Sequence, residues 1–354
     1  MVEGGKLRYS PGLDGLRALA CGAVFLFHAH VLHLVGGFLG VSVFFTLSGF
    51  LITSLLLDEL RSGQGFSPRS FWRRRIFRIV PLYAMVTLTG TIWALGAGGP
   101  LGRDTLIGAA GSACFLINWI LAWHGAAGGI LNGNWSVAVE EQFYVTWPLA
   151  LAGLRSRLRS ERAIAFILAT VAILIAGHRW MIASQGFTRS WYATDTQADA
   201  LLIGCVVALG WRARSRLLHV GAALAIIVAL FTARTDIQTA RIIMPLTAVS
   251  TAILVPFIQE HPGPLAWGPL VAIGRRSFGI YLWGCPIVYL LRFQGGLHGL
   301  ELVSLASVFT ALVAEPTYRL VELPMRRLGR QSSRPESRHP LLPPGAVAPV
   351  EDAA

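Results

Sequence analysis

The chain has 354 residues, of which 54% are hydrophobic and only 14% are charged. This composition is too apolar for a soluble domain and predicts a membrane protein with several spans. The formal net charge of +12 is compatible with a nucleic-acid partner. We expect no such partner, because the basic residues fall in short clusters between apolar runs, as the positive-inside rule for membrane proteins describes.

The apolar runs predict an all-α polytopic membrane protein with about ten (10–11) transmembrane helices in one bundle. The eleven candidate spans are centred near residues 25, 48, 88, 114, 144, 173, 205, 225, 250, 281 and 308. Three of them lie between the basic loops at 61–78 and 155–162. If both loops are cytoplasmic, one of the three segments between 79 and 154 does not cross fully, which leaves ten spans.

We expect one integral-membrane domain over residues 1–330, because no soluble domain or internal repeat is visible in the sequence. Residues 331–354 are rich in Pro, Ser and Ala and predict a disordered cytoplasmic tail. The apolar run after the polar head is too long for a cleavable signal peptide. Basic residues near both ends of the chain predict cytoplasmic N- and C-termini.

Small residues inside the apolar runs are interpreted as packing residues. The four cysteines are far apart, and no pair has the spacing of metal ligands, so we expect no metal site. The stretch at 40–52 is rich in Gly and Ser, which favours close packing between membrane helices.

Three ionisable residues, Asp14, Arg17 and His28, lie in the first apolar run. A charged group inside a span is costly, so each of them is a functional hypothesis by default. Arg17 and His28 are on one helix face and about 16 Å apart, and Asp14 can pair with Arg17 from one turn away. The structural alternative for His28 is a buried neutral imidazole that bonds a neighbouring helix.

A second polar group lies in the stretch NWSVAVEEQFYVTWP at 134–148. Glu140 and Tyr144 share one helix face, whereas Glu141 points about 100° away from it. As an alternative, both glutamates merely lie near an aqueous helix start, where the helix dipole favours them. If His28 and Glu140 converge from two helices, they form a general-base pair in which the carboxylate orients the imidazole.

Positive charge is concentrated in the stretch FWRRRIFRIVP at 71–81. It predicts either a cytoplasmic anchor of the following span or a cradle for an anion, and both interpretations stay open. Arg75 and Arg78 are one turn apart, and guanidinium groups suit phosphates through their paired N–H donors.

Two carboxylates lie in the stretch YATDTQADALLIG at 192–204. Asp195 and Asp199 are four positions apart at the start of a span, where we expect them to contact substrate at the outer mouth of the bundle. As an alternative they cap the helix, Asp195 in particular. Asp14 and Tyr144 complete the set of expected substrate-binding residues.

Taken together, these segments resemble the acyltransferase-3 family of integral-membrane acyltransferases. The resemblance covers residues 10–328 and rests on six segments in the family order. They are LDGLRALA with the Arg17–His28 spacing, GVSVFFTLSGFLIT, FWRRRIFRIVPLY, NWSVAVEEQFYVTWPL, TDTQADALLIG and SFGIYLWGCPI. Any one segment alone would be a weak signal, but six in order on a polytopic chain are a strong one.

The resemblance implies transfer of an acyl group, usually acetyl, from cytoplasmic acyl-CoA to a hydroxyl of a glycan, lipid-linked sugar or natural product. Acetyl-CoA or another acyl-CoA would be a donor substrate, with no permanently bound cofactor. The resemblance also implies a bacterial-type plasma membrane. It implies that Arg17 and His28 are required for activity. The paired-arginine feature of the family corresponds to Arg75 and Arg78, and its Trp-Ser-x-x-x-Glu carboxylate corresponds to Glu140.

The chain departs from the family pattern at three positions. The family often has Asp at Ser42, so we assign no role to a carboxylate there, and it usually has Arg at Gln197, which weakens a role of that loop as a charged clamp. It commonly has His at Gly284, so that histidine cannot be needed here. Some members carry a hydrolase-like soluble domain after the last span. The chain ends too soon after that span for such a domain, so we expect transfer to be completed within the membrane domain or with a partner protein.

The expected mechanism places the CoA phosphates on the arginines and the thioester near His28, which acts as general base on the acceptor hydroxyl. A covalent acyl relay is the alternative chemistry. The competing class of function is a transporter or flippase whose buried His, Arg and Glu line a substrate path. That class does not explain the arginine pair, and it predicts an inverted repeat that is not visible in the sequence.

Overall fold

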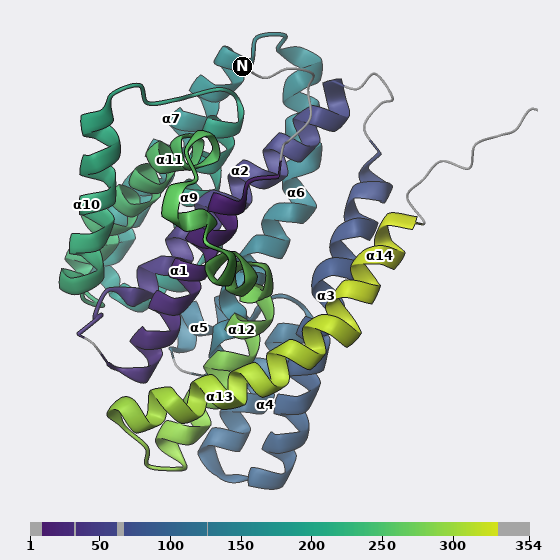
Figure 1. Cartoon of the computed structure of the whole chain (residues 1–354), viewed down its shortest axis with the longest axis vertical. Coiled ribbons are helices and arrows are strands. Elements are labelled where there is room, and N and C mark those ends of the chain that lie inside the picture. The colour runs from purple at the N-terminus through teal and green to yellow at the C-terminus, as the bar shows by residue number, and fades with distance from the viewer. Residues whose placement is uncertain (1–8, 32, 62–66, 126, 332–354) are drawn as a thin grey trace, which may run out of the picture.

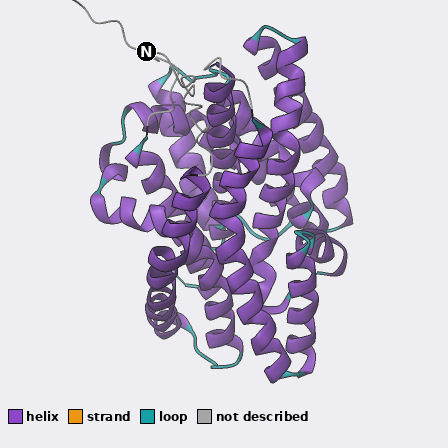
Figure 2. Ribbon diagram, turned by 90° about the vertical axis from the view of Figure 1, so that its right-hand side faces the viewer, coloured by secondary structure: helices purple, strands orange, loops and turns teal. Residues whose placement is uncertain are grey.

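The protein is all-helical in the computed structural model, which describes residues 9–31, 33–61, 67–125 and 127–331. These residues contain no strand, and their helices run mainly lengthwise in one bundle (Figures 1 and 2). The α-helices are α1 (Pro11–Ala29), α2 (Gly40–Arg61), α3 (Pro68–Ala97), α4 (Gly99–Ala113), α5 (Ile117–His124), α6 (Trp135–Arg157), α7 (Glu161–Ile182), α8 (Phe187–Tyr192), α9 (Thr194–Ala208), α10 (Arg216–Thr232), α11 (Met244–Glu260), α12 (Gly268–Phe293), α13 (Gly299–Thr317) and α14 (Leu323–Gln331). The short 3₁₀ and π segments are η1 (Gly37–Leu39), η2 (Gly129–Asn134), η3 (Ala183–Gln185), η4 (Thr239–Ile243), η5 (Gly263–Ala266) and η6 (Tyr318–Glu322).

Local sequence explains where helices α1 and α3 begin. Both α1 and α3 start with a proline in the first turn, where the missing N–H costs no hydrogen bond. The Ser67 side chain also caps α3 by accepting a hydrogen bond from the backbone N–H of Ser70 at 3.3 Å. Helix α1 ends at His30, which adopts the left-handed conformation with φ of 55°.

The small residues of α2 allow α2 and α9 to cross in direct contact, as the sequence predicts. A Cβ added at Gly49 would lie 1.9 Å from the carbonyl oxygen of Leu201 on α9. A Cβ added at Gly204 on α9 would lie 2.0 Å from the carbonyl oxygen of Thr46. Any larger side chain at either glycine would therefore separate the two backbones.

The segment around residue 114 is the broken one among the three between 79 and 154. Gly98 and Gly99 both have positive φ, at 61° and 64°, and this turn folds α4 back onto α3. Helix α4 has 15 residues and α5 has only 8, with a left-handed Phe115 between them. Neither helix alone reaches the roughly 20 residues that a span requires, whereas α3 has 30 and α6 has 23.

The expected all-α membrane fold is confirmed. Six described segments are long and apolar enough to cross a membrane, and they are Pro11–Ala29, Gly37–Arg61, Pro68–Ala97, Glu161–Gln185, Thr239–Glu260 and Gly299–Arg330. Outward-facing apolar side chains such as Phe166 on α7 and Leu217 on α10 are exposed in the isolated chain, which suits contact with lipid. The count of about ten spans stays a prediction, and the expected tail at 331–354 lies outside the described residues except for Gln331.

Candidate active site

The first cavity, which we call the arginine cavity, has a volume of about 420 Å³. It lies between α1, α2, α3, α6 and α12, with one residue each from α11 and α14, so it draws on five of the six segments that the sequence singles out. Its polar lining residues include Tyr9, Ser10, Asp14, Arg17, Ser48, Arg75, Arg78, Ser136, Glu140, Tyr144, Ser277 and Tyr281. The structure therefore brings together all of the expected catalytic and donor-binding residues except His28.

Three guanidinium groups in the arginine cavity have no protein carboxylate bonded to them. Within the described part of the chain, the side chains of Arg17, Arg75 and Arg78 take part in no hydrogen bond or ion pair. Arg75 instead lies over the ring of Tyr144, with 5.0 Å between its Cζ and the ring centroid. The N–H donors of all three arginines are thus available to an anionic molecule.

Glu140 faces the same cavity and is held by two hydroxyl groups. Ser48 donates to Glu140 Oε1 at 2.6 Å, and Tyr144 donates to Glu140 Oε2 at 3.2 Å. Glu141 lines neither cavity, and its Oε1 is buried with no hydrogen-bond partner in the structure. The different directions of the two glutamates agree with the helical spacing.

The expected pairing of Asp14 with Arg17 is wrong. Asp14 Oδ2 accepts a hydrogen bond from the Tyr9 hydroxyl at 2.9 Å and lies 3.5 Å from Arg275 Nε on α12. A Cβ added at Gly274 on α12 would lie 1.8 Å from the carbonyl oxygen of Asp14, so this glycine lets α12 approach α1 closely enough for the neighbouring Arg275 to reach the Asp14 carboxylate. Asp14 lines the mouth of the arginine cavity while anchoring α1 to α12.

The second cavity, which we call the histidine cavity, has a volume of about 440 Å³. Its walls come from α1, η2, α6, α8 and α12, together with the α1–α2 connection, Val41 on α2 and Thr235 between α10 and η4. Its polar and aromatic lining residues include His28, His30, Asn132, Trp135, Thr188, Trp191, Tyr192, Thr235, Tyr281, Tyr289, Arg292 and Phe293. Helix α1 contributes Arg17 to one cavity and His28 to the other, as eleven helical positions allow.

The backbone of α1 orients His28, which overturns the expected pairing with Glu140. His28 Nδ1 lies 2.8 Å from the carbonyl oxygen of Val24, and since a carbonyl only accepts, Nδ1 carries the proton. The neutral ring then has its lone pair on Nε2. Glu140 lines the arginine cavity and not the histidine cavity, so it does not orient the imidazole. The Val24 carbonyl does this instead, because it lies one helical turn before His28.

Tyr281 on α12 lines both cavities, and sequence reasoning did not select it as a site residue. Its hydroxyl accepts a hydrogen bond from Ser136 at 2.8 Å and donates one to the carbonyl oxygen of Gly133 at 2.9 Å. Val41 on α2 is the other residue common to the two linings. The thin partition between the cavities thus joins α12 to the start of α6.

Comparison with known proteins shows the family of this chain. The family model described as an acyltransferase domain, of the acyltransferase-3 family, matches residues 10–314. The chain is a member of the acyltransferase-3 family. No solved structure matches it.

Several curated members of the acyltransferase-3 family are similar to the chain over nearly its whole length. It is 32% identical to the putative peptidoglycan O-acetyltransferase YrhL of Bacillus subtilis, across 92% of this chain and 56% of that protein. It is 29% identical to the peptidoglycan O-acetyltransferase OatA of Listeria monocytogenes, across 91% and 56%. It is 30% identical to the O-acetyltransferase OatA of Staphylococcus aureus, across 91% and 58%. The chain therefore spans little more than half the length of these relatives.

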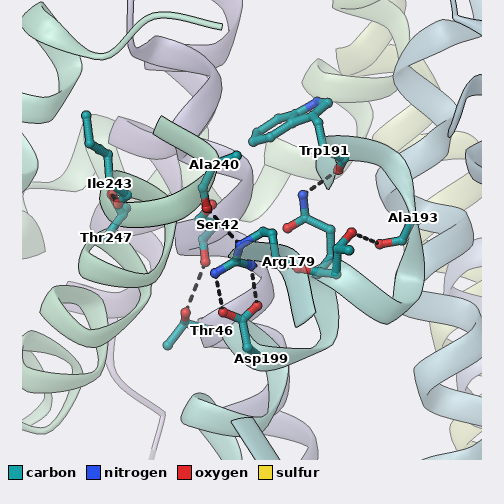
Figure 3. Close-up of polar contacts among 11 residues, drawn as sticks. Ser42, Thr46, Arg179, Trp191, Ala193, Asp199, Ala240, Ile243 and Thr247 are labelled. Atoms are coloured by element: carbon teal, nitrogen blue, oxygen red, sulfur yellow. Dashed lines mark hydrogen bonds and ion pairs between the residues drawn. The ribbon is translucent and has the colours of Figure 1, made fainter. Parts of the chain in front are cut away.

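In this member of the acyltransferase-3 family, the carboxylates of the stretch at 192–204 hold helices together, contrary to expectation. Asp199 is buried and forms a two-point ion pair with Arg179 on α7, at 2.7 and 2.6 Å (Figure 3). Asp195 pairs with Arg189 at 2.7 Å and with His178 at 3.1 Å, and it does not cap α9. Neither carboxylate lines a described cavity, because each faces basic groups of the neighbouring helices.

Arg179 is a residue that sequence reasoning missed. It is 1% exposed, and it also donates to the carbonyl oxygens of Thr196 at 2.6 Å and Ala240 at 2.9 Å (Figure 3). The Ala240 carbonyl belongs to the π segment η4, so one guanidinium joins α7, α9 and the start of α11. The available signal was an arginine in the last turn of an apolar helix, where a charged group that faces the bundle interior requires a partner.

Proposed function

We propose that this chain is a membrane O-acyltransferase that moves an acetyl group from acetyl-CoA, or another acyl group from its CoA thioester, to a hydroxyl of a cell-envelope glycan. Peptidoglycan is the first acceptor to test, since two curated relatives are named for its O-acetylation. The arginine cavity faces the cytoplasm in this proposal, because the basic start of α3 and the basic end of α14 lie beside it.

The observation that carries the proposal is the charge of the arginine cavity. Arg17, Arg75 and Arg78 bring three positive charges that no ion pair among the described residues neutralises. Of the two carboxylates in the cavity lining, Asp14 lies against Arg275, whereas Glu140 accepts hydrogen bonds from Ser48 and Tyr144. Phosphate groups satisfy guanidinium donors with charge-assisted hydrogen bonds. The phosphates of an acyl-CoA meet that requirement, and the thioester end extends toward the partition at Tyr281.

The proposed chemistry takes place at His28. Its Nε2 accepts the proton of the acceptor hydroxyl as the oxygen attacks the thioester carbonyl. A C–O bond forms, the C–S bond breaks, and the proton leaves on the CoA thiolate. A covalent acyl relay on His28 or on another nucleophile is the alternative chemistry.

Labelled donor tests this function directly. Membranes that contain the protein would be incubated with acetyl-CoA labelled in the acetyl group, and free CoA and labelled lipid, glycan and small-molecule fractions would be followed. CoA release together with label in one fraction supports the acyltransferase and indicates the acceptor class. No release from any common acyl-CoA, with folded protein, refutes it and favours the transporter class.

Replacing Arg75 or Arg78 by alanine should raise the apparent KM for acyl-CoA by about ten-fold or more, because each loses charge-assisted contacts with the donor. Steady-state kinetics with varied acyl-CoA and fixed acceptor measure this. Arg69 lies on the same helix outside the cavity, so Arg69→Ala is the matched control with an unchanged KM. A change in acceptor KM with the donor KM unaltered contradicts the assignment.

Glu140→Gln should lower kcat/KM more than Glu141→Gln, because only Glu140 faces the arginine cavity. The amide removes a negative charge beside three guanidinium groups and disturbs the hydrogen bonds from Ser48 and Tyr144. The two variants differ by one position on α6 and are matched in chemistry. Equal or reversed effects in the same transfer assay show that the cavity-facing carboxylate is the wrong choice.

A further inference from the structure

The histidine cavity contains a guanidinium group that the proposed chemistry does not use. Arg292 lies near the end of α12, and its Nη1 is 3.5 Å from the carbonyl oxygen of His28. Its Cζ lies 5.2 Å from the centre of the Phe293 ring. The long contact with a helix-end carbonyl occupies one of its five N–H donors, so most of the guanidinium fork is available to a bound molecule.

The charge around Arg292 is unbalanced. No Asp or Glu lines the described part of the histidine cavity, and Arg292 forms no ion pair with any described residue. Apart from Arg292, the titratable groups lining this cavity are the histidines His28 and His30, the tyrosines Tyr192, Tyr281 and Tyr289, and Cys285. A cationic side chain that is half-buried without a counter-charge favours an anionic ligand.

The remaining walls suit a sugar ring. Trp135, Trp191 and Tyr192 present flat apolar surfaces, with Trp135 and Trp191 packed at 5.2 Å between ring centres. Asn132, Thr188 and Thr235 provide polar groups that can bond hydroxyls. Aromatic walls with a few convergent polar groups are typical of sites that orient a small ligand.

We propose that the histidine cavity selects an acceptor sugar that carries a negative charge, a carboxylate or a phosphate, which Arg292 binds beside His28. This inference rests on the proposed function, because it takes the histidine cavity as the acceptor site. Arg292 thereby places one hydroxyl of the sugar within reach of the imidazole. Selection by charge is separable from acyl transfer and can be measured by binding alone.

The experiment measures equilibrium binding of three sugars to the full-length protein in nanodiscs by isothermal titration calorimetry. The first is fully N-acetylated chitotetraose, which is neutral, and the second is a tetrasaccharide of alternating N-acetylglucosamine and N-acetylmuramic acid, which adds lactyl carboxylates to the same backbone. The third is the 1-phosphate of fully N-acetylated chitotetraose. The anionic sugars should bind at least about ten-fold more tightly than the neutral one, and the second and third arms distinguish a carboxylate from a phosphate.

Variants at Arg292 separate charge from structure. Arg292→Gln should abolish the preference for the anionic sugars. Arg292→Lys should keep part of this preference, because lysine keeps the positive charge but lacks the paired N–H donors of the guanidinium group. Equal binding of the three sugars, binding of none, or a preference that survives Arg292→Gln overturns the inference. Charge-selective binding without any CoA release in the labelled-donor assay refutes the proposed function and leaves the anion selectivity established.

Discussion

His28→Ala is expected to lower the rate of acetyl transfer by a factor of about 10²–10⁴, the contribution that a positioned general base makes. The structure supplies the physical reason. The Val24 carbonyl fixes the proton on Nδ1 at 2.8 Å, so Nε2 is the basic nitrogen in the histidine cavity. CoA release from labelled acetyl-CoA at saturating acceptor measures the loss.

Two variants make the His28 result specific. His28→Asn keeps a donor close to the Val24 carbonyl but has no basic nitrogen, so it should be as inactive as His28→Ala. His124→Ala removes an exposed histidine that lines neither cavity, and it should retain full activity. Retained transfer in folded His28→Ala would exclude the general-base role and leave a structural histidine.

Arg179→Leu is expected to lower the free energy of unfolding by about 3–5 kcal/mol, the range measured when one partner of a buried ion pair is removed. The variant leaves Asp199 buried without its counter-charge and frees the carbonyl oxygens of Thr196 and Ala240 (Figure 3). Thermal unfolding of the purified protein in detergent, followed through Tm, measures the loss.

Matched variants test whether burial is the cause. Arg179→Leu combined with Asp199→Leu should recover much of the stability, because no unpaired charge remains. Arg61→Leu breaks a two-point pair with Glu161 at 2.8 and 2.7 Å that is partly exposed, and it should cost only about 0–1 kcal/mol. If Arg61→Leu and Arg179→Leu lower Tm by similar amounts, burial of the ion pair is not the cause of the destabilisation.

The positions of polar residues in the sequence predict most of the functional side chains that line the arginine cavity. The sequence by itself predicts Arg17, Arg75, Arg78, Glu140 and Tyr144 as site residues. Arg17, Glu140 and Tyr144 lie in apolar helices, where a polar group faces the interior of the bundle, and Arg75 and Arg78 lie in a basic cluster one turn apart. Helical spacing then decided which members of each cluster share a face, which is why Glu140 and not Glu141 lines the cavity.

The sequence does not predict which side chains from distant segments pair with each other. Asp14 has Arg17 one turn away, yet it bonds Tyr9 and lies against Arg275, because the crossing of α1 and α12 brings that arginine closer. Asp199 could not be recognised as a scaffold residue until α7 placed Arg179 beside it. Carboxylates that bind substrate and carboxylates that hold helices together have the same sequence signature.

The sequence alone determined the membrane class, the helical fold, the family and the list of polar residues, since these follow from hydropathy, period and spacing along one chain. Only the tertiary structure decided how these residues divide between two cavities, with His28 in one and Glu140 in the other and Tyr281 between them. The physical reason is that a helix fixes the separation of its own residues, about 1.5 Å per position. The distance between residues of different helices depends on packing, such as the glycine contacts of α2 with α9, which no single segment encodes.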